Sequence, residues 1–176
     1  TSLIAIESAF DSELQLLLSE TTDKKAYVLA GCTYTTGKLM GKDVVLFLTC
    51  GSSFYNSAIY TQIAFDHFNI SQLMFSGIAG GINPDLNIGD VVIATKSAEY
   101  LEMLAAREGP DGTYLPLPWF QFDPPNSHFL FLYPQVSYAV PPGGEPDKSM
   151  PYRWFPGDAK MIQVAQSVAG SAKLNN

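Results

Sequence analysis

Hydrophobic and polar positions up to residue 98 follow two periods, which predict strands and helices in alternation. The predicted strands are Ser2–Ile6, Tyr34–Leu39, Val44–Thr49, Leu73–Ser76 and Val91–Thr95, and the predicted helices are Phe10–Leu18 and Ala58–Phe68. The two strands that flank Met40–Asp43 are expected to form a hairpin. Ser8 and Asp11 have the spacing of a capping box at the start of the first helix. This alternation is typical of an α/β domain with a largely buried sheet.

The second half of the chain has a different pattern. Eleven of the twelve prolines lie between Pro110 and Pro156, together with both tryptophans. A loop of this length in a compact domain is usually functional, covered by a partner, or mobile. Alternation in His128–Tyr133 could supply a strand. From Asp158, a predicted N-cap, helical periodicity returns over Ala159–Ala169.

This pattern predicts one α/β domain over residues 1–176. It divides into a core at 1–98, an insertion rich in proline and aromatic residues at 109–157, and a helix at 158–170. Exposed aromatic side chains in such number would form a large apolar patch. The following aromatic residues are therefore expected to be buried against this chain, a second chain or a neighbouring subunit: Trp119, Phe120, Phe122, Phe129, Phe131 and Tyr133.

Composition and charge narrow the possible partners. Ten Lys and Arg against seventeen Asp and Glu give a net charge of −7, which disfavours nucleic acid and anionic membrane surfaces as partners. No apolar run is long enough to span a membrane. Cys32 and Cys50 lie in apolar contexts and are predicted to be small buried hydrophobic side chains. With His67 and His128 they give no zinc spacing, so neither a metal nor a cofactor is expected.

Glycine-centred turns follow two of the predicted strands. Gly51-Ser52-Ser53 follows the strand that ends at Thr49, and Ser76-Gly77-Ile78-Ala79-Gly80-Gly81 follows the strand that begins at Leu73. In an open α/β sheet, ligands bind beyond the carboxyl ends of the strands, where glycine lets a ligand approach the backbone. Each turn alone is weak evidence, and a simple reversal of the chain is the more frequent explanation of such a turn.

The whole run from Leu73 to Ala94 resembles the signature of the nucleoside phosphorylase superfamily. The most similar branch contains methylthioadenosine/S-adenosylhomocysteine nucleosidases and related plant vegetative and bark storage proteins. The resemblance covers residues 2–96 and resumes at Phe155–Ala169. It implies a mixed central sheet flanked by helices, and cleavage of a ribosyl N–C bond through a transition state with oxocarbenium character. Such a state needs a positioned nucleophile on one side and protonation of the purine on the other.

The same resemblance assigns the candidate site residues. Glu13 matches the glutamate that orients the attacking water, and without the resemblance it would be interpreted as an ordinary solvated carboxylate. The residues matched to substrate binding are Phe10, Gly51, Ser76, Gly77, Ile78, Ala79 and Gly80. Two positions depart from the family. Ser53 stands where a second turn glycine is usual, and Ala98-Glu99-Tyr100 replaces a common His-Asp pair.

The absence of cationic residues favours hydrolysis over phosphorolysis. Phe75 stands where phosphorolytic members have an arginine that binds phosphate, and no Lys or Arg occurs from Phe47 to Asp90. A doubly charged anion would enter such a site without compensation for its lost hydration, whereas water is neutral.

The family's acid side is not found in this sequence. A Met-Glu pair that holds the ribose and a Ser-Asp turn that protonates the base are missing, so residues 1–176 resemble only the N-terminal part of the fold. We expect a nucleoside or adenine as ligand, and either a homo-oligomer or a second chain that supplies the C-terminal half. Two hypotheses remain: a nucleosidase, cytoplasmic if metabolic, or a non-catalytic storage or nucleoside-binding member, processed or secreted.

Overall fold

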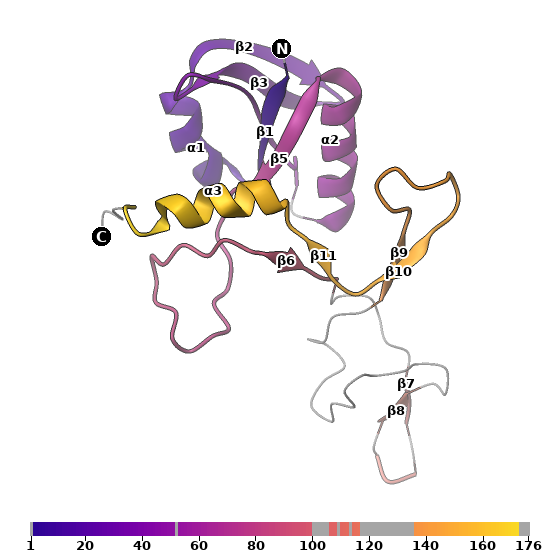
Figure 1. Ribbon diagram of the computed structural model, residues 1–176. Coiled ribbons are helices and arrows are strands. Elements are labelled where there is room, and N and C mark those ends of the chain that lie inside the picture. Colours follow the sequence, from indigo (N-terminus) through magenta and orange to yellow (C-terminus); the bar gives the residue numbers. More distant parts are fainter. Residues whose placement is uncertain are drawn as a thin grey trace. The chain divides into compact units, whose positions relative to one another are not determined.

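The computed structural model describes residues 2–51, 53–99, 106–108, 110–112, 114–116 and 136–172. The chain separates into two units, Thr1–Asp85 and Leu86–Asn176. In Figure 1 the first unit runs from indigo to magenta, and the second ends in the yellow C-terminal helix.

The first unit contains a five-stranded mixed sheet with strand order β2-β3-β4-β1-β5. The strands are β1 (Leu3–Ser8), β2 (Thr22–Leu29), β3 (Cys32–Leu39), β4 (Lys42–Leu48) and β5 (Ile70–Phe75). Strands β2, β3 and β4 are antiparallel neighbours, whereas β1 lies between β4 and β5 and runs parallel to both. The carboxyl ends of β1, β4 and β5 therefore meet at one edge of the sheet.

One helix covers each face of this sheet (Figure 1). Successive side chains of a strand point to opposite faces, so β1 and β4 contribute to two separate cores. The core beneath α1 (Asp11–Glu20) contains Ile6, Leu14, Val44 and Leu46. The core beneath α2 (Phe54–His67) contains Ala5, Cys32, Tyr34, Val45, Phe47 and Ala64. This arrangement confirms the prediction of an α/β fold with a mixed central sheet flanked by helices.

Most predicted elements of the first unit are present, but strand β2 and the start of α2 differ from the prediction. The hairpin is confirmed, since β3 and β4 pair around Met40 and Gly41, which both have positive φ. Strand β2 was not predicted, because this edge strand is largely exposed and lacks a clear apolar pattern. Helix α2 begins at Phe54, earlier than predicted, where the side chain of Ser53 accepts a hydrogen bond from the backbone N–H of Asn56 at 3.1 Å.

The predicted capping box at Ser8 is wrong. Ser8 is fully buried at the end of β1, and its hydroxyl donates to the carbonyl of Ser76 at 2.7 Å. The N-cap of α1 is Phe10, and Glu13 at the third helical position accepts a hydrogen bond from the Phe10 N–H at 3.3 Å. The capping glutamate is thus the residue that the family resemblance assigns to catalysis.

The second unit contains short strand pairs and one helix. The described pairs are β6 (Lys96–Ser97) with β11 (Phe155–Pro156), β7 (Ala106–Glu108) with β8 (Tyr114–Pro116), and β9 (Ser137–Ala139) with β10 (Met150–Tyr152). Helix α3 (Ala159–Ala169) has the predicted bounds, and its N-cap Asp158 accepts the Met161 N–H at 2.8 Å. Both predictions are confirmed.

One further prediction for this half of the chain is wrong, and two others lie outside the described residues. The strand predicted at Val91–Thr95 is wrong: Val91, Val92 and Ile93 are exposed and no described strand pairs with them. An apolar run is not a strand without a neighbour to complete its hydrogen bonds. The possible strand at His128–Tyr133 lies outside the described residues, as do the six aromatic residues predicted to be buried.

Candidate functional site

Three chain segments meet where β1, β4 and β5 end. The N–H of Ser76 donates to the carbonyl of Glu7 at 2.9 Å, and the N–H of Thr49 donates to the carbonyl of Ser8 at 3.0 Å. These bonds continue the parallel pairing past the strand ends. They bring the turn into α1, the turn into α2 and the loop after β5 together, as the rule for ligand sites in open α/β sheets anticipates.

Glu13 joins two of these segments through its carboxylate. Oε2 accepts the N–H of Ala9 at 2.8 Å and that of Phe10 at 3.3 Å, while Oε1 accepts the N–H of Ile78 at 2.8 Å. The side chain is half-buried and is not the freely solvated carboxylate that its place on a helix suggests. A carboxylate has about four acceptor positions, so these three bonds leave one free on Oε1. Glu13 can therefore accept a hydrogen bond from one further group, such as a water molecule.

The glycine at 77 is required by this carboxylate. A Cβ atom there would lie 2.6 Å from Oε1 and 2.9 Å from Cδ of Glu13. Gly80 differs, since a Cβ atom at that position would meet no atom within 4 Å. Of these two glycines, only Gly77 lies where a side chain would displace the carboxylate.

The other predicted site residues lie around the same edge but make different contacts. Phe10 is 40% exposed, and Ile78 is 80% exposed apart from its N–H bond to Glu13. Gly51 has a φ of +133°, and a Cβ atom there would collide with the side chain of Asn56. Ala79 and Gly80 are exposed. Their proposed contacts with a substrate stay predictions.

A pocket of about 460 Å³ opens beside these segments. It is lined by Ala9, Thr49, Ser53, Phe54, Ser57 and Phe75. None of these belongs to the predicted binding residues, although Ala9 and Phe75 are sequence neighbours of Phe10 and Ser76. Hydrophobic walls with a few hydroxyl groups are typical of a small-molecule site. The lining also explains the departure at Ser53, whose side chain caps α2 and also reaches the pocket.

Glu7 is a functional candidate that the sequence reasoning missed. Its side chain is only 2% exposed and lies on the face of the sheet beneath α2. Ser57 donates to Oε1 at 2.7 Å and Thr61 donates to Oε2 at 2.6 Å. A single acidic residue in an apolar strand, together with two hydroxyl residues four apart on a helix, is the pattern that could have indicated it.

The negative charge of Glu7 affects the ionisation of Tyr34, the buried tyrosine of β3. Burial, followed by the smaller effects of the nearby Tyr60 and Glu7, raises the pKa of Tyr34 to about 12. The hydroxyl of Tyr34 donates to the carbonyl of Tyr60 at 2.9 Å, so the buried phenol is satisfied in its neutral form.

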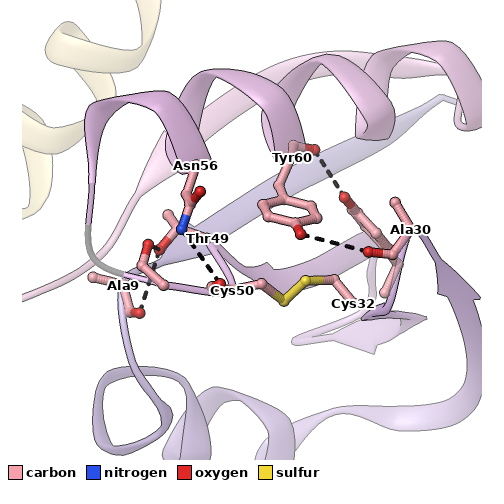
Figure 2. Close-up of a disulfide and its surroundings, with 9 residues drawn as sticks. Ala9, Ala30, Cys32, Thr49, Cys50, Asn56 and Tyr60 are labelled. Atoms are coloured by element: carbon pink, nitrogen blue, oxygen red, sulfur yellow. Dashed lines mark hydrogen bonds between the residues drawn. A yellow bond between two sulfur atoms is a disulfide. The ribbon is translucent and has the colours of Figure 1, made fainter.

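The two cysteines form a disulfide, which corrects the prediction that they are separate buried hydrophobic side chains (Figure 2). Cys32 begins β3 and Cys50 follows the end of β4, with their Cα atoms 6.1 Å apart. That separation is usual for a disulfide. Figure 2 also shows the side chain of Asn56 donating to the carbonyl of Cys50, and the hydroxyl of Thr49 donating to that of Ala9. The turn that borders the pocket is thereby attached to β3 by a covalent bond.

The phosphorylase superfamily model matches residues 3–173, nearly the whole chain. The chain belongs to the phosphorylase superfamily. A methylthioadenosine/S-adenosylhomocysteine nucleosidase of Marinomonas sp. (strain MWYL1) is 37% identical over 93 residues, which are 53% of this chain and 40% of the relative. The chain therefore spans about two fifths of the length of the curated relatives it matches.

Solved members of the phosphorylase superfamily share the fold. A nucleosidase of Colwellia psychrerythraea in complex with adenine has a TM-score of 0.54 at 32% identity, over 57% of this chain and 41% of that one. One from Neisseria meningitidis in complex with methylthio-immucillin-A has a TM-score of 0.66 at 22% identity, over 97% of this chain and 59% of that one. The predicted resemblance to this nucleosidase branch is thus confirmed.

Neither a membrane-spanning helix nor a metal-binding cluster is found among the described residues. No described helix has the length and apolar character of a membrane span. Within the same residues, no group of three or more His, Cys, Asp or Glu side chains could hold a metal ion.

Proposed function

We propose that this protein hydrolyses the N-glycosidic bond of methylthioadenosine, S-adenosylhomocysteine or a similar purine nucleoside, with Glu13 orienting the water. The observation that carries the proposal is the fixed carboxylate of Glu13, held by three backbone N–H groups with one acceptor position left. A water bound there would have an oriented lone pair, which is what attack on an oxocarbenium-like carbon needs. The nucleosidase relatives support the substrate class.

Hydrolysis is favoured over phosphorolysis by the charges around the site. The chain carries no Lys or Arg between residues 47 and 90, and the carboxylates of Glu7 and Glu13 both lie at this edge. A phosphate dianion would be repelled here and would lack a cation to replace its hydration. We expect phosphate to leave the rate unchanged and the sugar product to be free ribose or methylthioribose. Formation of a ribose 1-phosphate would overturn the choice of water as nucleophile.

We infer that the remaining groups of the site come from outside these residues. The proposed substrate-binding residues are Phe10, Gly51, Ser76, Gly77, Ile78, Ala79 and Gly80. No group that could protonate the purine is assigned among them. A homo-oligomer, or a second chain that supplies the C-terminal half of the fold, would complete the site.

The variant Glu13→Gln tests the role of Glu13. The amide nitrogen would face either the N–H of Ile78 or those of Ala9 and Phe10, so the variant also loses a hydrogen bond that holds the site together. We expect turnover of methylthioadenosine to fall by about 10²-fold or more, the scale of a lost general base, while adenine binding is nearly unchanged. Adenine binding by calorimetry separates lost chemistry from lost folding. Unchanged hydrolysis in a folded variant would end the proposed role.

The disulfide favours a second candidate function. Disulfides persist in oxidising compartments and are rare in the cytosol, which fits a processed or secreted protein better than a metabolic enzyme. A non-catalytic storage or nucleoside-binding member of the same superfamily would retain the pocket and the fold. Adenine binding without hydrolysis of any purine nucleoside, in wild-type protein under oxidising conditions, would favour this candidate.

A further inference from the structure

A buried carboxylate lies directly behind one wall of the pocket. The side chain of Glu7 is linked to the pocket through Ser57, a lining residue whose hydroxyl donates to Oε1 at 2.7 Å. Thr61, one helical turn further along α2, donates to Oε2 at 2.6 Å but is not among the lining residues. Two hydroxyl groups thus satisfy the same carboxylate, and only one of them belongs to a residue that lines the pocket.

The hydrogen bonds already made determine what each pocket hydroxyl can offer. A hydroxyl group has one proton and two lone pairs. Ser57 donates its proton to Glu7, and Thr49 donates its proton to the carbonyls of Ala9 and Gly51, at 3.4 and 3.1 Å. Ser53 accepts from the N–H of Asn56, and no hydrogen bond of its own proton is found among the described residues. Ser57 and Thr49 therefore present only lone pairs to a ligand, and Ser53 can donate.

The carboxylate makes Ser57 the strongest of these acceptors. Hydrogen bonds in a chain polarise one another, so a hydroxyl that donates to a buried carboxylate becomes a better acceptor. Its negative charge also disfavours an anionic group in the pocket, and none of the lining residues carries a positive charge. The remaining walls, Ala9, Phe54 and Phe75, are apolar. The pocket thus suits a neutral or cationic group with an O–H or N–H donor.

We propose that Ser57, oriented by Glu7, determines specificity by accepting a hydrogen bond from an O–H or N–H group of a nucleoside. The inference rests on the proposed function, because it takes the ligand to be a nucleoside. It goes further because it names Ser57 as the residue that recognises the ligand and a hydrogen-bond donor as the group that this residue selects. Thr61 has a positioning role only, since it donates to Glu7 and does not line the pocket.

Ligands that differ by one donor group test this assignment. Adenosine, 5′-deoxyadenosine, which lacks the 5′-hydroxyl, and purine riboside, which lacks the 6-amino group, are titrated by calorimetry. With wild-type protein we expect one of the two deletions to weaken binding by about 10-fold, the scale of one hydrogen bond to a charge-assisted acceptor. With Ser57→Ala the same deletion should change affinity by less than about 2-fold. The loss of this discrimination is a readout that a purely structural role would not produce.

Two further variants control for folding. Thr61→Val removes the other hydroxyl from Glu7 and should preserve the 10-fold discrimination. Ser57→Ala leaves Glu7 with one donor, so it is paired with the triple variant Glu7→Met, Ser57→Ala and Thr61→Val. This variant replaces the whole network by apolar groups of similar volume, which is often nearly neutral for stability. It should fold, bind nucleosides and fail to discriminate between them.

The outcomes separate this inference from the proposed function. Discrimination that persists in Ser57→Ala or in the triple variant, or that is absent from wild-type protein which binds all three nucleosides, overturns the role of Ser57 alone. Wild-type protein that binds none of the three overturns the proposed function and this inference with it. Millimolar inorganic phosphate should leave the affinity for adenosine unchanged, and competition by phosphate would contradict the expected exclusion of anions.

Discussion

Replacing Gly77 by alanine should break the connection between Glu13 and the loop after β5. The added Cβ would lie 2.6 Å from Oε1 and 2.9 Å from Cδ of Glu13, so the carboxylate must move. Gly77 does not have a positive φ, and alanine therefore causes no backbone strain of its own. The substitution acts only through the displaced carboxylate.

The cost follows from the hydrogen bonds that the carboxylate makes. Moving Oε1 away from the N–H of Ile78 removes a charge-assisted bond, worth about 1.5–3 kcal/mol in a protein. The bonds of Oε2 to Ala9 and Phe10 cap α1, and losing a cap costs about 1 kcal/mol. We expect Gly77→Ala to lower the free energy of unfolding by about 2–4 kcal/mol. It should also abolish any hydrolysis that depends on Glu13.

Urea unfolding followed by far-UV circular dichroism measures this loss. Gly80→Ala is the matched control, because its Cβ meets no atom within 4 Å, and it should cost less than about 0.5 kcal/mol. In a Glu13→Ala background, Gly77→Ala should become nearly neutral, since the group it displaces is gone. Equal losses with and without Glu13 would refute the steric argument.

Three other predictions concern the disulfide, the buried tyrosine and the last helix. Cys32→Ala with Cys50→Ala should lower the free energy of unfolding by about 2–4 kcal/mol, from a loop separation of 18, and dithiothreitol should then have no further effect in urea unfolding. Because the pKa of Tyr34 is raised to about 12, its neutral form stabilises the fold fully below pH 10, and about 2–3 kcal/mol of stability is lost between pH 10 and 12. Tyr34→Phe should remove this dependence when unfolding is measured as a function of pH, and an unchanged profile would contradict the prediction. Asp158→Ala should cost α3 about 1 kcal/mol, visible as earlier loss of helical signal on heating, whereas no change would indicate that the cap is dispensable.

Elements with strong local signals were predictable from the sequence. Helix α3 has an aspartate cap and helical spacing, and β3 and β4 are joined by the short turn Met40-Gly41, so both are decided by near neighbours in the chain. The strand expected at Val91–Thr95 failed for the opposite reason. Its apolar residues meet the local requirement, but a strand also needs a partner, and periodicity does not show whether one is present.

The disulfide was within reach of the sequence once the hairpin was predicted. Tyr34 pairs with Phe47, so extending this register by two residues places Thr49 opposite Cys32 and Cys50 one residue beyond. Considering each cysteine by its own apolar context concealed that relation. A strand register shows which distant residues lie close together, whereas an argument from composition considers each cysteine separately.

The candidate site was predictable only in part, because the contacts of its residues depend on how distant segments of the chain pack. Glu13 was identified by family resemblance, whereas its bonds to Ala9, Phe10 and Ile78 depend on how β1 and β5 end. Glu7 was not identified, since an acidic residue in an apolar strand acquires meaning only when α2 is docked over it. That the chain forms one domain lacking part of the family's sheet stays a prediction.

The order of strands also has a consequence for synthesis on the ribosome. Strand β1 precedes β4 and β5 in the sequence, yet it lies between them, and these two strands end at Leu48 and Phe75. At about 5–20 residues per second, β1 waits roughly 3–13 s for its second neighbour, while β2, β3 and β4 can form their antiparallel ribbon from adjacent segments. The edge that gathers Glu13, Ser57 and Gly77 is therefore completed after the ribbon, and early exposure of β1 is the vulnerable stage of its folding.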